Sequence, residues 1–320
     1  MLKNLQEYYY GEIPQEGMRK FLAEAEKTSV AEAIDSFLIP NFEKGRWLKK
    51  YIADDSRADW RFLLEPNPEG RVLDLGCGYG GISIPLADMF GEIVAADPTF
   101  ERMETVRLRC RDEGIKNIET VQADALNLPF EDKSFDGVVM MGVLEWVAVG
   151  KEGKVEDLQQ KALKEIFRVL KPHGFFVLGI ENRFGYNYFL GEGDEHSHLK
   201  FTTLMPRFLA NWVSRHRSNR SYRTYTYSYR GYQKLLRQAG FSNLKFWGAI
   251  PKYRYPDFVI DFSKSEPLEY YIKSIGKKTG VKKYGFAFVK LLHRLGIWKH
   301  FFPTFIIVTT KVVTPSTRGE

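Results

Sequence analysis

Residues 71–81 read Arg-Val-Leu-Asp-Leu-Gly-Cys-Gly-Tyr-Gly-Gly, and no other part of the chain carries as much structural information. The first half is apolar and predicts a short buried strand over 71–75, with Asp74 close to its end. Four glycines follow, at positions 76, 78, 80 and 81. Glycine tolerates positive φ and lets a ligand approach the backbone closely. A strand that enters such a turn before a helix predicts a nucleotide-binding crevice.

The carboxylate of Asp74 indicates which kind of ligand this turn holds. A dinucleotide-binding turn directs backbone N–H groups at a pyrophosphate, which a neighbouring carboxylate would repel. A ligand with a cationic end suits the turn better. The pattern Asp-Leu-Gly-Cys-Gly-Tyr-Gly over 74–80 closely resembles the first motif of class I S-adenosylmethionine-dependent methyltransferases, whose cofactor carries an ammonium and a sulfonium.

Short apolar strands alternate with amphipathic helices along the rest of the chain. Such alternation predicts an α/β fold with a mostly parallel sheet and helices on both faces. The resemblance implies the Rossmann-like, seven-stranded sheet of class I methyltransferases, whose last two strands form an antiparallel pair. Strands are predicted at 71–75, 92–97, 118–122, 135–141, 174–180, 243–250 and 304–313, and helices at 79–89, 100–113, 155–170 and 229–239.

Two kinds of segment lie outside this predicted sheet. Residues 1–65 predict helices, broken at Pro14 and Pro40, that form an N-terminal lid over the cleft, with Tyr8, Tyr9 and Tyr10 as candidate lid aromatics. Residues 66–320 form the predicted methyltransferase domain, with insertions at about 182–228 and 251–303. Long insertions in such a fold are usually functional.

Two further strands end in carboxylates that suit this cofactor. Asp97 lies 21 positions after Gly76, and an acidic residue there can accept both hydroxyls of a ribose. By resemblance, Asp124 accepts from the adenine amino group, and the backbone of the next residue reads the ring nitrogens. The predicted cofactor-binding residues are therefore Asp74, Gly76, Cys77, Gly78, Asp97, Pro98, Asp124, Ala125 and Gly142.

A methyl acceptor must be aligned within about 3–3.5 Å of the activated carbon, and a hydroxyl acceptor also needs a base. Trp146 stands where many relatives have a histidine, so a histidine base there is excluded. His196 is the first candidate base, His198 the second and Glu181 the third, while Glu145 is predicted to position the acceptor or the cofactor ammonium. The alternative is that both histidines lie in a surface loop and Glu145 caps the next segment.

A narrower resemblance starts after the fifth predicted strand. The stretch Gly-Ile-Glu-Asn-Arg-Phe-Gly over 179–185, with Gly-Asp-Glu-His-Ser-His over 193–198, resembles a methyltransferase group found with surface-polysaccharide genes. This implies a sugar hydroxyl of a cell-surface glycan, or of its phosphate- or lipid-linked precursor, as acceptor. The predicted acceptor-binding residues are Glu181, Asn182, Arg183 and Arg223. No metal site is predicted, because consecutive acidic and histidine residues at 194–196 rarely converge on one ion.

Positive charge is concentrated towards the C-terminus. The chain carries a net charge of +7, but residues 201–320 hold 22 Lys and Arg against 5 Asp and Glu. This asymmetry favours an anionic partner, with a solvated basic surface as the alternative. Arginine alternates with tyrosine over 215–230, which would suit a phosphate-bearing glycan or, less well, nucleic acid.

Residues 264–301 mix lysines with apolar side chains and predict a basic amphipathic pair of helices. These helices could contact an anionic membrane peripherally, or pack on their own domain or on a second copy in a homodimer. The chain has no run of about 18 apolar residues and only two cysteines, Cys77 and Cys110. These features predict a cytoplasmic protein, membrane-associated if that contact forms, without disulfides or a cysteine-built zinc site.

The leading interpretation is an O-methyltransferase that acts on a glycan. An RNA methyltransferase is one alternative, although Gly-Val-Leu-Glu over 142–145 lacks the Asn/Asp-Pro-Pro-Tyr/Phe motif of N-methylating RNA enzymes. A quinone-like or other small aromatic acceptor is a second alternative, and it leaves the basic region unexplained. A catalytically idle cofactor-binding subunit is a third.

Overall fold

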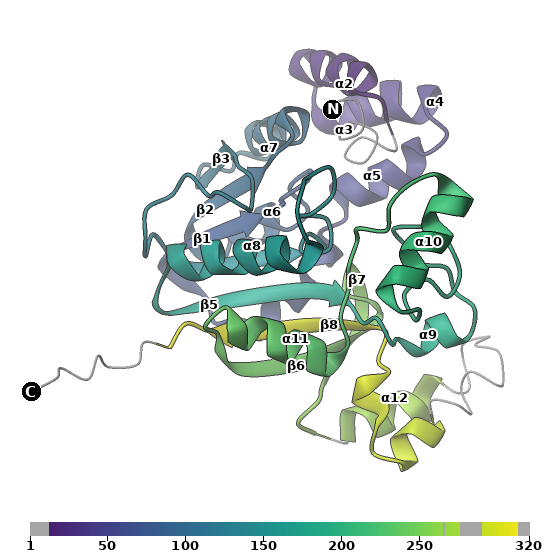
Figure 1. Ribbon diagram of the computed structural model, residues 1–320. Coiled ribbons are helices and arrows are strands. Elements are labelled where there is room, and N and C mark those ends of the chain that lie inside the picture. Colours follow the sequence, from purple (N-terminus) through teal and green to yellow (C-terminus); the bar gives the residue numbers. More distant parts are fainter. Residues whose placement is uncertain (1–12, 265, 276–289, 313–320) are drawn as a thin grey trace, which may run out of the picture.

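The computed structural model describes residues 13–264, 266–275 and 290–312, which form one sheet with helices on both faces (Figure 1). The sheet has eight strands in the order β3-β2-β1-β4-β5-β8-β6-β7. The five strands from β3 to β5 are parallel, and the remaining three pair antiparallel. The strands are β1 (Asn67–Leu75), β2 (Phe90–Asp97), β3 (Ile118–Gln122), β4 (Phe135–Met141), β5 (Leu170–Glu181), β6 (Ser242–Lys252), β7 (Tyr255–Asp261) and β8 (Thr304–Thr310).

This architecture confirms the predicted α/β Rossmann-like fold and corrects the number of strands from seven to eight. The extra strand is β7, at the edge of the sheet and inside the predicted insertion 251–303. It returns antiparallel along β6 after a turn at Tyr253 and Arg254, with Ala249 opposite Val259. The predicted antiparallel pair is β6 with β8, which leaves the β6–β7 hairpin as an addition to the edge.

Helices cover each face of the sheet because strand side chains alternate between the faces. Leu73 and Val138 pack in the same core as α8 and α11, whereas Val72 and Val139 pack in a core with Trp60 of η2. The helices of this domain are α6 (Ser83–Ala87), α7 (Phe100–Glu113), α8 (Val155–Val169), α9 (Tyr186–Phe189), α10 (Arg207–Ser218), α11 (Tyr229–Gln238), α12 (Glu266–Ile275) and the 3₁₀ turn η3 (Trp298–His300).

The N-terminal helices form their own small core, which docks on α7 (Figure 1). Arg109 of α7 bonds directly to this unit. Its Nη1 donates to the carbonyl oxygens of Ile52 in the N-terminal unit, at 2.6 Å, and of Tyr79 in the glycine turn, at 3.3 Å. The candidate lid tyrosines 8–10 lie outside the described residues. The helices are α2 (Gln15–Lys27), α3 (Val30–Ala33), the π-helical turn η1 (Ile34–Leu38), α4 (Ile39–Asn41), α5 (Gly45–Ala53) and the 3₁₀ segment η2 (Asp55–Leu63).

The apolar side chains predicted to contact a membrane over 264–301 are partly buried and partly exposed in the part of the segment that the structure describes. Ile272, Leu292 and Phe302 are buried. Leu291 and Leu295 are exposed, while the predicted Phe286 and Phe288 lie in a part of the chain that the structure does not describe. None of the described helices is long and apolar enough to cross a bilayer.

Asn182 directly follows β5 and connects three segments of the chain. Its side-chain amide donates to the carbonyl oxygens of His300, at 2.9 Å, and Phe302, at 2.7 Å, and its Oδ1 accepts from the backbone N–H of Phe184. The residue is fully buried. Asn182 therefore holds the β5 exit against the segment before β8, and the prediction that it binds the acceptor is wrong for this geometry.

Replacement of Asn182 by Ala should lower the free energy of unfolding by about 2–4 kcal/mol, because it removes three hydrogen bonds and leaves buried carbonyl oxygens unpaired. Urea unfolding measures this loss. The matched control is Asn41→Ala, which removes one exposed hydrogen bond and should change stability by under about 0.5 kcal/mol. A loss at Asn182 no larger than that of the control would contradict the structural role.

Candidate active site

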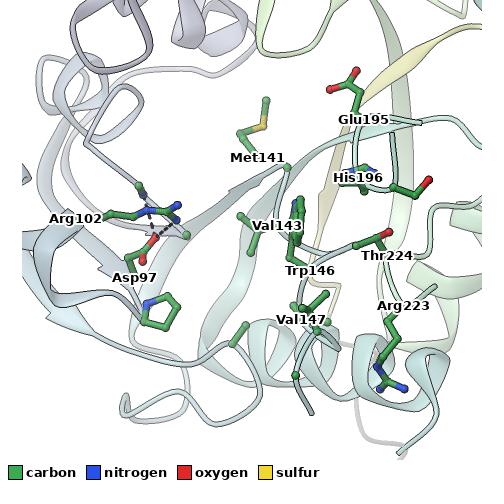
Figure 2. A pocket seen from close by; sticks show the side chains of 18 of the residues that line it. Asp97, Arg102, Met141, Val143, Trp146, Val147, Glu195, His196, Arg223 and Thr224 are labelled. Carbon is green, nitrogen blue, oxygen red and sulfur yellow. Dashed lines mark hydrogen bonds and ion pairs between the residues drawn. The ribbon is translucent and has the colours of Figure 1, made fainter. Parts of the chain in front are cut away.

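A cavity of about 1700 Å³ opens at the carboxyl ends of β1, β2 and β4. Pockets for one small ligand usually measure about 300–1,000 Å³, so this cavity has room for a cofactor and an acceptor side by side. Asp97 and Arg102 lie on one side of it, and Trp146, His196 and Arg223 lie on the other (Figure 2).

The glycine turn after β1 forms one wall of the cavity. Gly76 adopts φ +83°, and a Cβ there would collide with Val143, so the turn needs glycine at this position. The backbone N–H groups of Gly76 and Cys77 both donate to the carbonyl oxygen of Ala96 in β2, at 2.7 and 3.1 Å. These two bonds hold the turn against the neighbouring strand. Gly76, Cys77 and Gly78 all line the cavity, as predicted for cofactor-binding residues.

Asp97 is held rigidly beside this turn. Its Oδ2 accepts from the backbone N–H of Gly78 at 3.2 Å and lies 3.7 Å from Nη1 of Arg102, and its Oδ1 accepts from the N–H of Thr99. The carboxylate lines the cavity, as does Pro98. This arrangement fits the predicted role of Asp97 as the acceptor of ribose hydroxyls, because the side chain cannot rotate away.

Asp124 and Ala125 line the cavity next to Asp97, on the segment that follows β3. Oδ1 of Asp124 accepts from the backbone N–H of Leu126, and Oδ2 pairs with the ammonium group of Lys151. Lys151 also lines the cavity. An adenine ring bound here would therefore meet a carboxylate that already has a cationic partner, which the sequence analysis did not foresee.

Asp74 lies behind the glycine turn instead of in the cavity wall. Its carboxylate is about 1% exposed and accepts from the Ser83 hydroxyl at 2.6 Å. Burial raises the pKa of Asp74 to about 6, although the Ser83 hydrogen bond and Arg57 act in the opposite direction. The prediction that Asp74 touches the cofactor directly is therefore not met, since the carboxylate acts at the cavity only through the turn.

The N-terminal helices complete the cofactor side. Lys44, Trp47 and Tyr51 of this unit line the cavity together with Arg57. The Arg57 guanidinium stacks 3.9 Å from the ring centre of Tyr51. The sequence analysis predicted residues 1–65 as a lid but did not single out Trp47 or Tyr51, because helical periodicity does not show which face meets another domain.

The opposite end of the cavity is built around His196. Nδ1 of its imidazole lies 3.0 Å from Oδ1 of Asp194, and Nε2 lies 3.4 Å from Oε1 of Glu145 and 4.0 Å from Oε2 of Glu181. All four side chains are almost completely buried. The cluster of Glu145, Glu181, Asp194 and His196 is called the His196 cluster below.

A tight turn directs the imidazole inwards. The Asp194 carboxylate accepts from the backbone N–H of His196 at 3.1 Å and from the Ser197 hydroxyl at 2.8 Å. Aspartate commonly forms such turns because its short side chain reaches the backbone two residues later. The same turn places His198 in the cavity wall, at a positive φ of 56°. The alternative of two surface-loop histidines is thus not what the structure shows for His196.

The electrostatics of the His196 cluster differ from those of a lone histidine base. Burial and the nearby Glu145 raise the pKa of Glu181 to about 7. Burial alone would lower the pKa of His196, but Asp194 and Glu145 outweigh it and raise that pKa well above its ordinary value. A raised pKa favours the protonated imidazole, and His196 as the base, with Glu145 beside it, stays a prediction. The chemistry at this end belongs to the cluster.

Of the two remaining residues predicted to bind the acceptor, one lines the cavity and the other does not. Arg223 lines the cavity, although its guanidinium donates to the carbonyl oxygens of Ala148 and Gly153, at 2.9 and 3.0 Å. Arg183 does not line it, because its guanidinium donates to the carbonyl oxygens of Thr203 and Met205. The prediction that Arg183 binds the acceptor is therefore wrong for this geometry.

The β6–β7 hairpin supplies residues that the sequence analysis missed. Arg254 lines the cavity, with Nη2 3.8 Å from Oε1 of Glu181. Gly142, predicted to contact the cofactor, also lines it and adopts φ +70°. A Cβ there would collide with the hydroxyl group of Tyr253. Nothing in the sequence marked Tyr253 and Arg254 as site residues, because only the closure of the hairpin places them beside the end of β4.

Replacement of Asp74 by Asn should stabilise the protein by about 2 kcal/mol at pH 8, because the wild-type fold buries a carboxylate whose pKa is about 6 instead of 3.8. Because the pKa of Asp74 is higher in the folded state than in the unfolded state, the wild-type fold is more stable below pH 4 than at pH 8. This extra stability is lost as the pH rises through about 6. The advantage of the variant should therefore vanish near pH 4. Urea unfolding at both pH values measures it, and a variant that is less stable at pH 8 would contradict the buried-charge argument.

Comparisons with known proteins agree with this geometry. A family described as a methyltransferase domain matches residues 73–178. A demethylmenaquinone methyltransferase of Clavibacter sepedonicus is 40% identical over 108 residues, which are 34% of this chain and 40% of that protein. The ubiquinone/menaquinone biosynthesis C-methyltransferase UbiE of Coxiella burnetii is 37% identical over 112 residues, covering 34% of this chain and 41% of that protein. The chain thus spans about two fifths of the length of these relatives.

Solved structures show the same fold. One match is a chain of the complex between the Haloferax volcanii Trm112 methyltransferase activator and a methyltransferase, with a TM-score of 0.50 and 18% identity. That match covers 88% of this chain and 98% of the other. Residues 73–178, with their glycine turn and the acidic residue that ends β2, therefore form a class I methyltransferase domain of the kind that uses S-adenosylmethionine.

Proposed function

We propose that this protein transfers a methyl group from S-adenosylmethionine to an acceptor bound beside His196 and Trp146. The observation that carries the proposal is a single cavity whose lining includes both the glycine turn and His196. Methyl transfer requires the acceptor atom to be held in line with the activated carbon, in a site that excludes water. A cofactor on the Asp97 side would leave the His196 side for the acceptor.

A quinone-like ring is the acceptor that the comparisons support better. The relatives named above act, by their names, in menaquinone and ubiquinone biosynthesis. Between the two ends of the cavity, the lining includes Met141, Trp146, Val147 and Val149, which suit a flat apolar ring. Because the chain covers only about two fifths of those relatives, their acceptor is carried over as a proposal.

A sugar hydroxyl of a phosphate-bearing glycan is the second candidate acceptor. It is favoured by polar and cationic residues of the cavity lining, namely Arg220, Ser221, Arg223 and Arg254. Arginine binds phosphate through paired hydrogen bonds. The predicted glycan interpretation depends on these residues, whereas the quinone interpretation depends on the apolar middle of the cavity.

Methyl transfer can be tested with labelled S-adenosylmethionine and three acceptor fractions: quinone lipids, glycans with glycolipids, and RNA. The wild-type protein should label the quinone or the glycan fraction. Label in RNA alone would contradict both candidate acceptors. Cofactor binding without label in any fraction would contradict the proposed activity.

Replacement of His196 by Ala should lower kcat at least about 100-fold while the Kd for S-adenosylmethionine changes less than about twofold, because His196 lies at the acceptor end of the cavity. Steady-state kinetics and calorimetry measure the two quantities. The matched control is His173→Asn, at an exposed position of β5 with φ +65°, where asparagine is tolerated and kcat should be unchanged. Equal kcat in both variants would remove His196 from the reaction.

We also propose peripheral contact with an anionic membrane through α10, while contact through the segment 264–301 stays a prediction. Phe208, Leu209 and Trp212 of α10 are exposed, with 77% of Phe208 and 57% of Trp212 accessible. The same helix ends in Arg215 and Arg217, which are also exposed. Exposed aromatic residues beside cationic ones are typical of helices that lie in a membrane interface. Since the segment from 218 to 224 lines the cavity, a lipid-borne acceptor would enter beside this helix.

The double substitution of Phe208 and Trp212 by Ser should lower binding to anionic phosphatidylglycerol vesicles at least tenfold, because it removes the side chains that would enter the interface. Vesicle co-sedimentation measures the effect. Phe62→Ser, which changes an equally exposed aromatic residue on η2, should bind like the wild type. Binding that is absent in the wild type, or unchanged in the double variant, would contradict the α10 contact.

A further inference from the structure

Three metal-ligating side chains from three separate segments meet at the acceptor end of the cavity. Glu145 follows β4, Glu181 ends β5, and His196 lies on the turn beyond α9. One ligand atom from each can be chosen so that all three lie within 4.8 Å of one another. Two ligand atoms of a single ion at about 2.0–2.2 Å lie at most about 4.4 Å apart, so these three atoms have to close up by a few tenths of an ångström around a bound ion.

The hydrogen bonding inside this group is incomplete. Both carboxylate oxygens of Glu145, both of Glu181 and Nε2 of His196 are buried and have no hydrogen-bond partner. The distance of 3.4 Å from Nε2 to Glu145 is too long for a good N–H···O bond. Each buried polar atom that lacks a partner costs about 1–3 kcal/mol, and native proteins rarely gather five of them in one place. An ion among these atoms would satisfy all of them.

The other ring nitrogen of His196 has the partner that metal-binding histidines usually have. Nδ1 lies 3.0 Å from Oδ1 of Asp194, whose carboxylate is itself held by Ser197. A carboxylate at this position fixes the ring orientation and directs the lone pair of Nε2 towards the opposite side. That side is where Glu145 and Glu181 lie.

The charge of the group also calls for two more positive charges. A histidine that binds a metal ion through Nε2 is neutral, so in the ion-bound state the negative charge of the His196 cluster comes from its three carboxylates, three units in all. Arg254 offsets one of them through Glu181. Lys252 lies 2.7 Å from Glu195 and is engaged there. Buried charges are tolerated only when they are paired, and a divalent cation would bring the sum to zero.

We propose that Glu145, Glu181 and His196 bind one divalent cation of the first transition series. One imidazole nitrogen with carboxylate oxygens is a mixed donor set that suits Mn²⁺, Fe²⁺ or Zn²⁺ better than Ca²⁺. The prediction that the chain has no metal site considered only neighbours in sequence, whereas these three ligands come from distant segments. The binding claim stands without the proposed methyl transfer.

The chemical role of the ion does rest on the proposed function. A divalent cation lowers the pKa of a hydroxyl group that coordinates it, so that the oxygen can attack without a separate strong base. His196 lines the cavity, which puts the ion close to the acceptor.

Titration of the metal-stripped full-length protein with Mn²⁺, followed by electron paramagnetic resonance of the free ion, tests the site. We expect one Mn²⁺ per chain with a micromolar or tighter Kd, and a higher Tm in its presence, because an ion that binds only the folded state stabilises it. Saturation near one Mn²⁺ per chain would support the proposal. The proposal would be overturned if neither ion bound at 1 mM, with Mn²⁺ measured by electron paramagnetic resonance and Zn²⁺ by calorimetry.

Variants separate this site from other carboxylates. Glu145→Gln and Glu181→Gln should each weaken Mn²⁺ binding at least 100-fold, and Asp194→Asn by about 10–100-fold. Because both glutamine variants remove a buried unpaired charge, we expect them to fold. Glu195→Gln is the matched control, since that carboxylate faces Lys252 and Arg254, and its Kd should stay within about twofold. Equal weakening in the control, or none at Glu145 and Glu181, would overturn the assignment.

These measurements distinguish failure of the metal site from failure of the proposed function. Mn²⁺ binding is measured without cofactor or acceptor, so a protein that binds the ion but transfers no methyl group keeps the site and loses the function. Methyl transfer that is unaffected by removal of metal, in a protein that binds none, keeps the function and loses the site.

Discussion

The parallel pairing of β1 with β2 and β4 brings the glycine turn, Asp97 and Gly142 of the candidate active site to one edge of the sheet. Leu75 lies opposite Ala96, and Asp74 lies opposite Val139, so the three strands end at the same edge. The glycine turn, Asp97 and Gly142 therefore open into one cavity although they are far apart in sequence. The two hydrogen bonds from the turn to Ala96 tie the turn to this register. A shift of one residue would turn the apolar side chains of β1 to the opposite faces and separate the turn from Asp97.

The end of the cavity around His196 depends instead on interactions between buried ionisable side chains. Glu145 and Glu181 come from the ends of neighbouring strands, and the Asp194 turn supplies the imidazole between them. The cost of burying these carboxylates is offset in part by Arg254 from the hairpin that this chain adds to the sheet edge. The additional strand β7 is thus connected to the chemistry of the site, since its turn carries both Arg254 and the tyrosine that packs on Gly142.

The Asp97 end and the His196 end of the cavity also differ in how far the match to known proteins covers them. The matched family covers residues 73–178, which include the glycine turn, Asp97 and Asp124 but not His196, Arg223 or Arg254. Segments outside the matched region therefore form most of the acceptor end. This division explains why the cofactor follows from comparison, whereas the acceptor is a proposal that depends on the geometry of this chain.

The amino-acid sequence by itself determined the fold class, most strand positions and the cofactor. These features depend on local patterns, such as the glycine turn after an apolar strand and the carboxylate at the end of β2. Such patterns can be recognised without the tertiary structure. It also singled out Glu145, Glu181 and His196 as separate candidates. Only the tertiary structure decided that these three meet, that Asn182 and Arg183 bind backbone carbonyl groups instead of an acceptor, and that β7 brings Arg254 into the cavity. The physical reason is that a side chain's partners at long range depend on strand register and hairpin closure, and no local pattern of residues encodes the distance between them.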